Sequence, residues 1–111
     1  MNLPDLADEA RRLSTLLDNG LKALRTAALE LAHAENAYRK GVAQAWLLAP
    51  EGISPARQAW VDAECADLRM TRDLADAERS TAAQAVKARG IQLTLLMSLL
   101  SAHRAEAELS R

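Results

Sequence analysis

The sequence predicts an all-α protein, a long antiparallel helical hairpin similar to a coiled coil, which assembles into a homo-oligomer. The first reason is composition: half of the 111 residues are hydrophobic, yet only 3% are aromatic and Phe is absent. Much of that half is Ala, which favours long, closely packed helices and buries little area. The other reasons are a heptad repeat and one clear turn. A chain of this length predicts one domain, residues 1–111.

The first predicted helix runs from about residue 5 to residue 49. Pro4 and Asp5 favour a helix start, because Pro suits the first turn and acids oppose the positive end of the dipole. Apolar or Gly residues then alternate by three and four, which predicts one narrow seam against a partner helix. Asn19 and Gly20 have turn composition, but the repeat passes through them in register. One helix is favoured, and two helices broken there are the alternative. The seam residues are Leu3, Leu6, Ala10, Leu13, Leu17, Gly20, Leu24, Ala27, Leu31, Ala34, Tyr38, Gly41, Ala45 and Leu48.

Residues 50–54 form the predicted turn, and the second helix is expected from about residue 55 to residue 109. Pro50 stops the first helix, and Ser54 followed by Pro55 has the pattern of an N-cap and a first helical residue. A short connection between long helices predicts antiparallel packing. The apolar pattern of the second helix is less regular, because Arg72 and Arg79 interrupt it. One apolar stripe comprises Val61, Cys65, Leu68, Ala75, Ala82 and Val86, and a second comprises Ala63, Ala66, Met70, Leu74, Ala77, Ala85 and Ala88.

The predicted turn brings large side chains of the two helices together. In an antiparallel hairpin, residues whose numbers sum to about 106 face each other. Trp46 is therefore expected near Trp60, and Tyr38 near Leu68. The two Trp residues are interpreted as side chains that fix the turn by burying a large area. A base-stacking or partner-binding role for one of them is the alternative.

The apolar run Ile91–Leu100 predicts a subunit interface. Its side chains cover most of the helix circumference, whereas one partner helix covers a single side. A thin two-helix hairpin also buries too little area to be stable alone. Leucines near both ends of the chain place the interface at the termini. The predicted interface residues are Leu6, Leu13, Leu17, Ile91, Leu93, Leu96, Met97 and Leu100.

The sequence offers no pattern for catalysis, for a metal or for a cofactor. Cys65 is the only cysteine, so neither an internal disulfide nor a thiol cluster is expected. Glu30 and His33 have the spacing of di-iron bundles, but a second such pair is missing. No phosphate-binding Gly-rich loop or nucleophile motif occurs. We expect no enzyme activity. The run Ile91–Leu100 is too short to span a membrane and no signal peptide is evident, so we expect a cytoplasmic protein.

Positive charge is concentrated in an acid-free segment from Arg79 to Arg104. An oligomer would repeat this segment in every subunit and present a track for a phosphate backbone. Single-stranded nucleic acid is the natural ligand, because no groove-reading motif is present. Alternatively, these side chains cover the seam and pair with acids of a neighbouring subunit. The candidate nucleic-acid-binding residues are Lys87, Arg89, Arg79, Arg104, Arg39 and Lys40.

Residues 34–40 (AENAYRK), the turn near Trp60 and above all residues 86–93 (VKARGIQL) resemble UvsY-like phage recombination mediators. Those small helical proteins form rings, bind single-stranded DNA and help to load a RecA-type recombinase onto DNA covered by a single-strand-binding protein. The resemblance spans about residues 30–105. It places Lys87 and Arg89 in the family's C-terminal helical region, and Arg39–Lys40 is the nearest candidate for its basic DNA-binding stretch.

Two hypotheses follow from these patterns. The first is an oligomeric recombination mediator that binds single-stranded DNA and a recombinase, and the resemblance implies a bacteriophage protein acting in the host cytoplasm. The second is a helical structural or adaptor protein, phage or bacterial, that binds only protein partners. Both predict an oligomer of hairpins, and they differ in the role of the basic segment.

Overall fold

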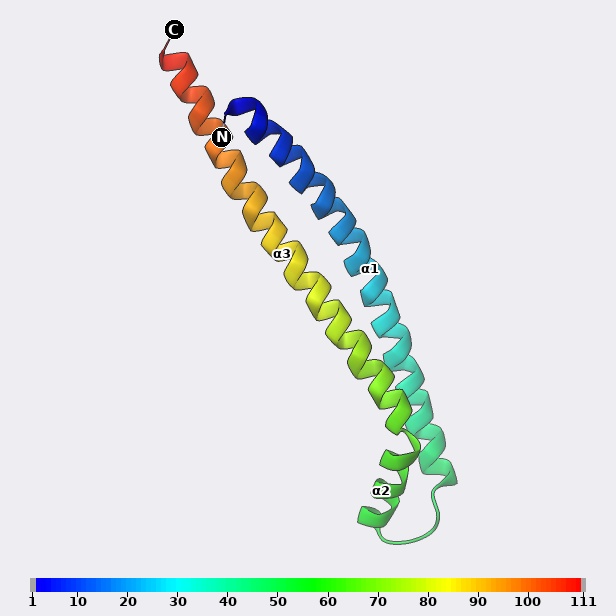
Figure 1. The fold of residues 1–111 in the computed structure, drawn as a ribbon. Helices are drawn as coiled ribbons and strands as arrows, with labels where there is room; N and C mark the ends of the chain where they lie inside the picture. Colours follow the sequence, from blue (N-terminus) through cyan, green and yellow to red (C-terminus); the bar gives the residue numbers. More distant parts are fainter. Residues whose placement is uncertain (1, 111) are drawn as a thin grey trace. The chain divides into compact units, whose positions relative to one another are not determined.

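The computed structural model describes residues 2–110, and helices make up nearly all of that part of the chain (Figure 1). Helix α1 spans Leu3–Leu48, α2 spans Ser54–Glu64 and α3 spans Ala66–Leu109. No strand occurs among the described residues. The all-α prediction is confirmed. The chain reverses direction at residues 49–53, in place of the predicted 50–54.

Helix α1 is continuous and begins two residues before the predicted start. The Asn2 side chain caps it, because Asn2 Oδ1 accepts a hydrogen bond of 2.9 Å from the Asp5 backbone N–H. The helix passes through Asn19 and Gly20 without a break, so the two-helix alternative is wrong. It ends at Leu48, two residues before Pro50, whose ring disfavours helical geometry in the residue before it.

The heptad seam of α1 faces the later helices, as the sequence predicts. Every seam residue from Leu6 to Ala45 is buried or half-buried, whereas the first and last, Leu3 and Leu48, are exposed. The seam of α2 and α3 is equally regular in the structure. Buried and half-buried positions alternate by four and three residues from Val61 to His103. Arg72, Arg79 and Arg89 occupy positions of this second seam.

The second half of the hairpin is two helices, where the sequence predicts one helix from about residue 55 to residue 109. The helix is interrupted at Cys65, whose backbone has φ −98° and ψ 7°. The hydrogen-bond ladder continues across the break, because Cys65 N–H donates to the Val61 carbonyl at 3.0 Å and Arg69 N–H donates to the Cys65 carbonyl at 2.9 Å. The predicted N-cap is also shifted. Ile53 is the N-cap residue of α2 without a side-chain capping bond, and Ser54 is already helical.

The chain packs as two compact units. Unit one comprises α1 up to Leu24 with α3 from Thr81, and unit two comprises residues 25–80. The core of unit one joins the start of α1 to the end of α3, with Ala7 and Leu93 packed against it. Its buried residues are Leu6, Ala10, Leu13, Leu96 and Leu100.

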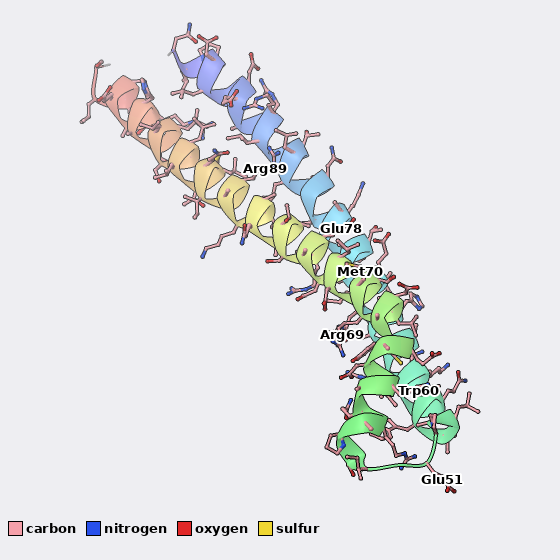
Figure 2. The ribbon with its side chains drawn as sticks, turned by 60° about the horizontal axis from the view of Figure 1, so that its bottom comes forward. Glu51, Trp60, Arg69, Met70, Glu78 and Arg89 are labelled. Carbon is pink, nitrogen blue, oxygen red and sulfur yellow. The ribbon has the colours of Figure 1, made fainter. Side chains whose placement is uncertain are left out.

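The core of unit two lies beside the connection between α1 and α2. Ala45, Val61 and Cys65 are buried there, and Val61 is only 1% exposed. Trp46 and Trp60 both pack against this cluster, so the prediction that they lie close together is confirmed. In Figure 2, Trp60 lies on α2, close to the connection that carries Glu51. Tyr38 and Val42 extend the same cluster along α1.

Candidate assembly and nucleic-acid surfaces

The hairpin's own core accounts for half of the predicted interface residues. Leu6, Leu13, Leu96 and Leu100 are between 3% and 8% exposed, because the seam of unit one buries them. Leu17 and Leu93 are half-buried. Only two members of the predicted set, Ile91 and Met97, are exposed to solvent. The apolar run of α3 therefore divides into side chains that close the hairpin and side chains that remain accessible.

A stripe of accessible aliphatic side chains runs along one side of α3. Ile91, Leu95 and Leu99 follow each other at intervals of four residues, which places them on one face of a helix. They are 52%, 63% and 52% exposed. We call these three residues the α3 apolar stripe. Leu95 and Leu99 also line a groove between α3 and α1 whose α1 side includes Glu9 and Arg12.

An ion pair forms the polar rim of this groove. Arg12 Nε donates a hydrogen bond of 3.0 Å to Glu9 Oε2, and a second guanidinium nitrogen contacts the other carboxylate oxygen. The hydrogen bond from Arg12 lowers the pKa of Glu9, and the same bond raises the pKa of Arg12. Both side chains are thus charged at neutral pH, and the groove has apolar walls with a fixed charged edge.

The predicted nucleic-acid-binding residues do not form one patch. Lys87 is exposed and Arg89 is half-buried, because residues two apart point to different sides of a helix. Arg39 pairs with Glu35 at 4.0 Å, and Arg79 pairs with Asp76 at 3.5 Å. Lys40 and Arg104 are exposed. Within residues 2–110, no ion pair involves Lys40, Lys87, Arg89 or Arg104.

Two of these cations, Lys87 and Arg104, flank an exposed face of α3, and Lys87 also borders the apolar stripe because it lies four residues before Ile91. Lys87, Thr94 and Ser101 repeat every seven residues, and so do Gly90, Met97 and Arg104. Between Lys87 and Arg104 is a shallow hollow lined by Leu93, Thr94, Met97, Ser98 and Ser101. The Thr94 hydroxyl donates to the Gly90 carbonyl at 3.0 Å, so its hydrogen is already used. We define the α3 basic face as Lys87, Thr94, Met97, Ser98, Ser101 and Arg104.

An arginine inside the seam of unit two contacts an aromatic ring. The Arg72 guanidinium carbon is 4.4 Å from the centre of the Tyr38 ring, and Arg72 also pairs with Asp73 at 2.9 Å. The Tyr38 hydroxyl, more than the nearby Asp62 carboxylate, raises the pKa of Arg69. Arg72 thus occupies a seam position by stacking on Tyr38, which explains how an arginine interrupts the apolar pattern.

The structure exposes a second apolar surface that the sequence interpretation missed. Leu47, Leu48 and Ile53 are 86%, 75% and 73% exposed at the connection between α1 and α2. Trp60 is half-buried and lines two hollows, one with Leu48 and Glu64, the other with Glu51 and Arg57. The sequence signal for this surface was the position of Leu47, which lies outside the heptad seam and directly before the turn. We define the turn surface as Leu47, Leu48, Glu51, Ile53, Trp60 and Glu64.

Other kinds of site are not found in the described part of the chain. Among residues 2–110, no three His, Cys, Asp or Glu side chains are grouped so that they could hold a metal ion. No helix there is long and apolar enough to cross a membrane. Comparison of the chain with protein-family models, curated proteins and solved structures finds no match. The resemblance to UvsY-like mediators therefore stays a hypothesis.

Proposed function

We propose that this chain is a non-enzymatic, self-assembling helical hairpin that binds single-stranded DNA and acts as a recombination mediator. The observation that carries the proposal is the division of α3 into two accessible sides. One side is the α3 apolar stripe and the other is the α3 basic face, and Lys87 lies where the two meet. A protein with this arrangement can associate through one side while the other side contacts a ligand.

The apolar stripe supports self-assembly. Ile91, Leu95 and Leu99 are each about half exposed or more, so three neighbouring aliphatic side chains contact water in the single chain. At about 25 cal/mol per Å² of apolar area, covering such side chains with a second subunit is favourable. Contiguous exposed apolar surface of this kind marks interaction sites in soluble proteins.

The basic face supports nucleic-acid binding in an assembled form. Lys87 and Arg104 are exposed and have no ion-pair partner among the described residues. No acidic residue occurs between Arg79 and Ala105 to repel a phosphate backbone. Two cations per subunit bind a strand weakly, but an oligomer places many copies on one strand and raises the avidity. The partners that we propose with it, a RecA-type recombinase and a single-strand-binding protein in the cytoplasm, derive from the family resemblance.

Binding of a labelled oligonucleotide across a salt series tests this function. We expect binding at low salt, with a salt slope of about −0.7 for each single-strand phosphate contacted. The Arg104→Ala variant should lower the affinity and reduce the slope. The matched control Arg25→Ala removes the same charge from α1 and should bind as wild type does. If wild-type protein fails to bind at low salt, the mediator function is wrong.

A protein-only adaptor is the second candidate. It is favoured by the turn surface, which is apolar, carries acids and so suits a protein partner better than DNA. It is also favoured by a formal net charge of −1, which is unusual for a nucleic-acid-binding chain. In the same experiment, an assembled protein that binds no oligonucleotide at any salt concentration identifies the adaptor.

A further inference from the structure

We propose that the turn surface of one subunit docks on the α3 apolar stripe of a second copy of this chain, so that subunits associate head to tail. The inference rests on the proposed self-assembly and names the two surfaces that make the contact. It does not depend on nucleic-acid binding. The sequence interpretation placed the termini of the subunits against each other, and the turn surface had no part in it.

Both surfaces carry exposed apolar side chains that contact between them would bury. On the turn surface, Leu47, Leu48 and Ile53 are all at least 73% exposed within a seven-residue segment. The stripe offers Leu95, which is 63% exposed, with Ile91 and Leu99 one turn away on either side. In the single chain, neither group of side chains is covered by other residues of the unit to which it belongs. Apposition of the two removes both patches from water in a single contact.

Trp60 gives the turn surface the shape of a docking site. Its half-buried ring lines one hollow with Leu48 and Glu64 and another with Glu51 and Arg57. Figure 2 shows Trp60 and Glu51 in this region of the chain. An aliphatic side chain that enters a hollow beside a Trp ring is a common anchor of protein interfaces. The stripe supplies such side chains at intervals of one helical turn.

Charge favours contact between unlike surfaces. Residues 44–65 contain three acids and one base, Arg57; Asp62 pairs with Arg69 at 3.2 Å, and Glu51 and Glu64 are the acids of the turn surface. Residues 81–105 contain three bases and no acid, and of these bases Lys87 borders the stripe, whereas Arg89 lies in the seam and Arg104 on the basic face. Glu51, Glu64 and Lys87 form no ion pair within residues 2–110.

Lys87 lies one helical turn before Ile91 and therefore borders the stripe. A turn surface docked on the stripe brings Glu51 and Glu64 toward Lys87, which is an attractive arrangement. Two stripes, or two turn surfaces, placed against each other would bring like charges together. Such contact is unfavourable, so the charges select the head-to-tail pairing.

The proposed contact has consequences for assembly. A head-to-tail interface leaves one free turn surface and one free stripe in every pair of subunits. Association then continues, and the product is a closed ring or an open filament according to the rotation at each contact. The contact uses the stripe and Lys87 at its border, and it leaves Met97, Ser101 and Arg104 of the basic face accessible.

Mixing two interface variants tests the proposal. The turn variant is Leu47→Glu/Leu48→Glu, and the stripe variant is Leu95→Glu/Leu99→Glu. Each retains one intact surface, so each alone should be a monomer with the chain mass of 12.0 kDa. An equal mixture should form a one-to-one complex of twice that mass and nothing larger. Size-exclusion chromatography with light scattering measures these masses, and circular dichroism checks that both variants stay helical.

Several outcomes overturn the head-to-tail contact. A turn variant that assembles as wild type does would show that stripes pair with each other. A mixture that stays monomeric would show that the two surfaces do not meet. A wild-type protein that is itself a monomer would instead remove the self-assembly on which the inference rests. The control Leu29→Glu/Leu74→Glu alters two side chains of similar exposure outside both surfaces and should assemble normally.

Charge-reversed variants provide a second test that leaves the apolar side chains unchanged. Glu51→Lys/Glu64→Lys should weaken self-association, and so should Lys87→Glu, because each places like charges at the contact. An equal mixture of the two should associate more tightly than either variant alone, since a reversed turn surface then meets a reversed stripe. Analytical ultracentrifugation compares the dissociation constants. An absence of this recovery would contradict the charge pairing.

Discussion

Gly41 of α1 faces Leu68 of α3 so closely that a methyl group at position 41 would overlap Leu68 Cδ1. Both residues occupy seam positions of unit two. A glycine inside a helix costs about 1 kcal/mol relative to alanine. The Leu68 side chain fills the space that the missing Cβ leaves, so this glycine allows close approach of two helices. Gly90 differs, because a Cβ there would meet nothing within 4 Å.

Gly41→Ala and Gly90→Ala should therefore change stability in opposite directions. Gly90→Ala should raise the free energy of unfolding by about 1 kcal/mol, from helix propensity alone. Gly41→Ala gains the same propensity but forces Leu68 to move, and overpacking costs about 1–3 kcal/mol. We expect a net decrease of about 1 kcal/mol. Urea unfolding at one fixed protein concentration measures both values. Equal stabilisation by the two variants would show that Leu68 moves aside without cost.

Leu96 and Leu95 are neighbours in sequence with different expected roles. Leu96 is 8% exposed in the core of unit one, whereas Leu95 is 63% exposed. Leu96→Ala should lower the free energy of unfolding by about 2–4 kcal/mol, because it leaves a cavity against α1. Leu95→Ala should change it by less than about 1 kcal/mol in the monomer and should weaken self-association. Thermal unfolding of dilute protein and light scattering separate the two effects, and a reversed ranking would mean that the seam register is wrong.

The heptad of α1 made most of the fold predictable. Its fourteen seam positions combine Leu, Ala, Gly and one Tyr at strict spacing, and Pro50 marks its end, so one long helix and a reversal follow directly. The second half was harder to interpret. Arg72, Arg79 and Arg89 occupy its seam, and a charged residue at such a position conceals the repeat. Neither Gly nor Pro marks the break at Cys65.

The surfaces could be predicted only in part. The sequence indicates that Ile91–Leu100 exceeds what one partner helix covers, and the exposure of Leu95 agrees with that. The sequence does not indicate which leucines face α1, because this requires knowledge of which α3 residues form the seam. Because the seam of α3 was not known, the sequence prediction grouped Lys87 with Arg89, although their side chains lie on different sides of the helix. The turn surface was missed because the position of Leu47 outside the seam was the one signal in the sequence, and the exposure of Leu48 and Ile53 depends on how the chain packs at the turn.

Arg57 should stabilise the connection between α1 and α2. Its guanidinium donates a hydrogen bond of 3.3 Å to the Trp46 carbonyl, one of the last four carbonyls of α1. It also lies 5.4 Å from the centre of the Trp46 ring. Arg57→Ala should lower the free energy of unfolding by about 1–3 kcal/mol, from the charged hydrogen bond and the ring contact. Urea unfolding followed by Trp fluorescence measures the change. Arg25→Ala, at an exposed arginine of α1, is the control. An equal decrease in the free energy of unfolding for both variants would exclude this capping role.

The Glu9–Arg12 pair should make the stability of unit one depend on pH in the acidic range. The hydrogen bond from Arg12 lowers the pKa of Glu9 in the folded chain. A carboxylate with a lowered pKa stabilises the fold above its unfolded pKa, and this stabilisation is lost as the pH falls through the folded pKa.

Glu9→Gln should therefore be less stable than wild type at neutral pH, and the difference should disappear under acidic conditions. Arg12 is exposed and Glu9 is half-buried at the surface, so the effect is small and weakens with added salt. Thermal midpoints of wild type and variant, measured from about pH 7 to about pH 3 at low salt, give the difference at each pH. Glu30→Gln is the control, because Glu30 forms no ion pair within residues 2–110. A difference for Glu9→Gln that grows toward low pH would contradict the assigned pair.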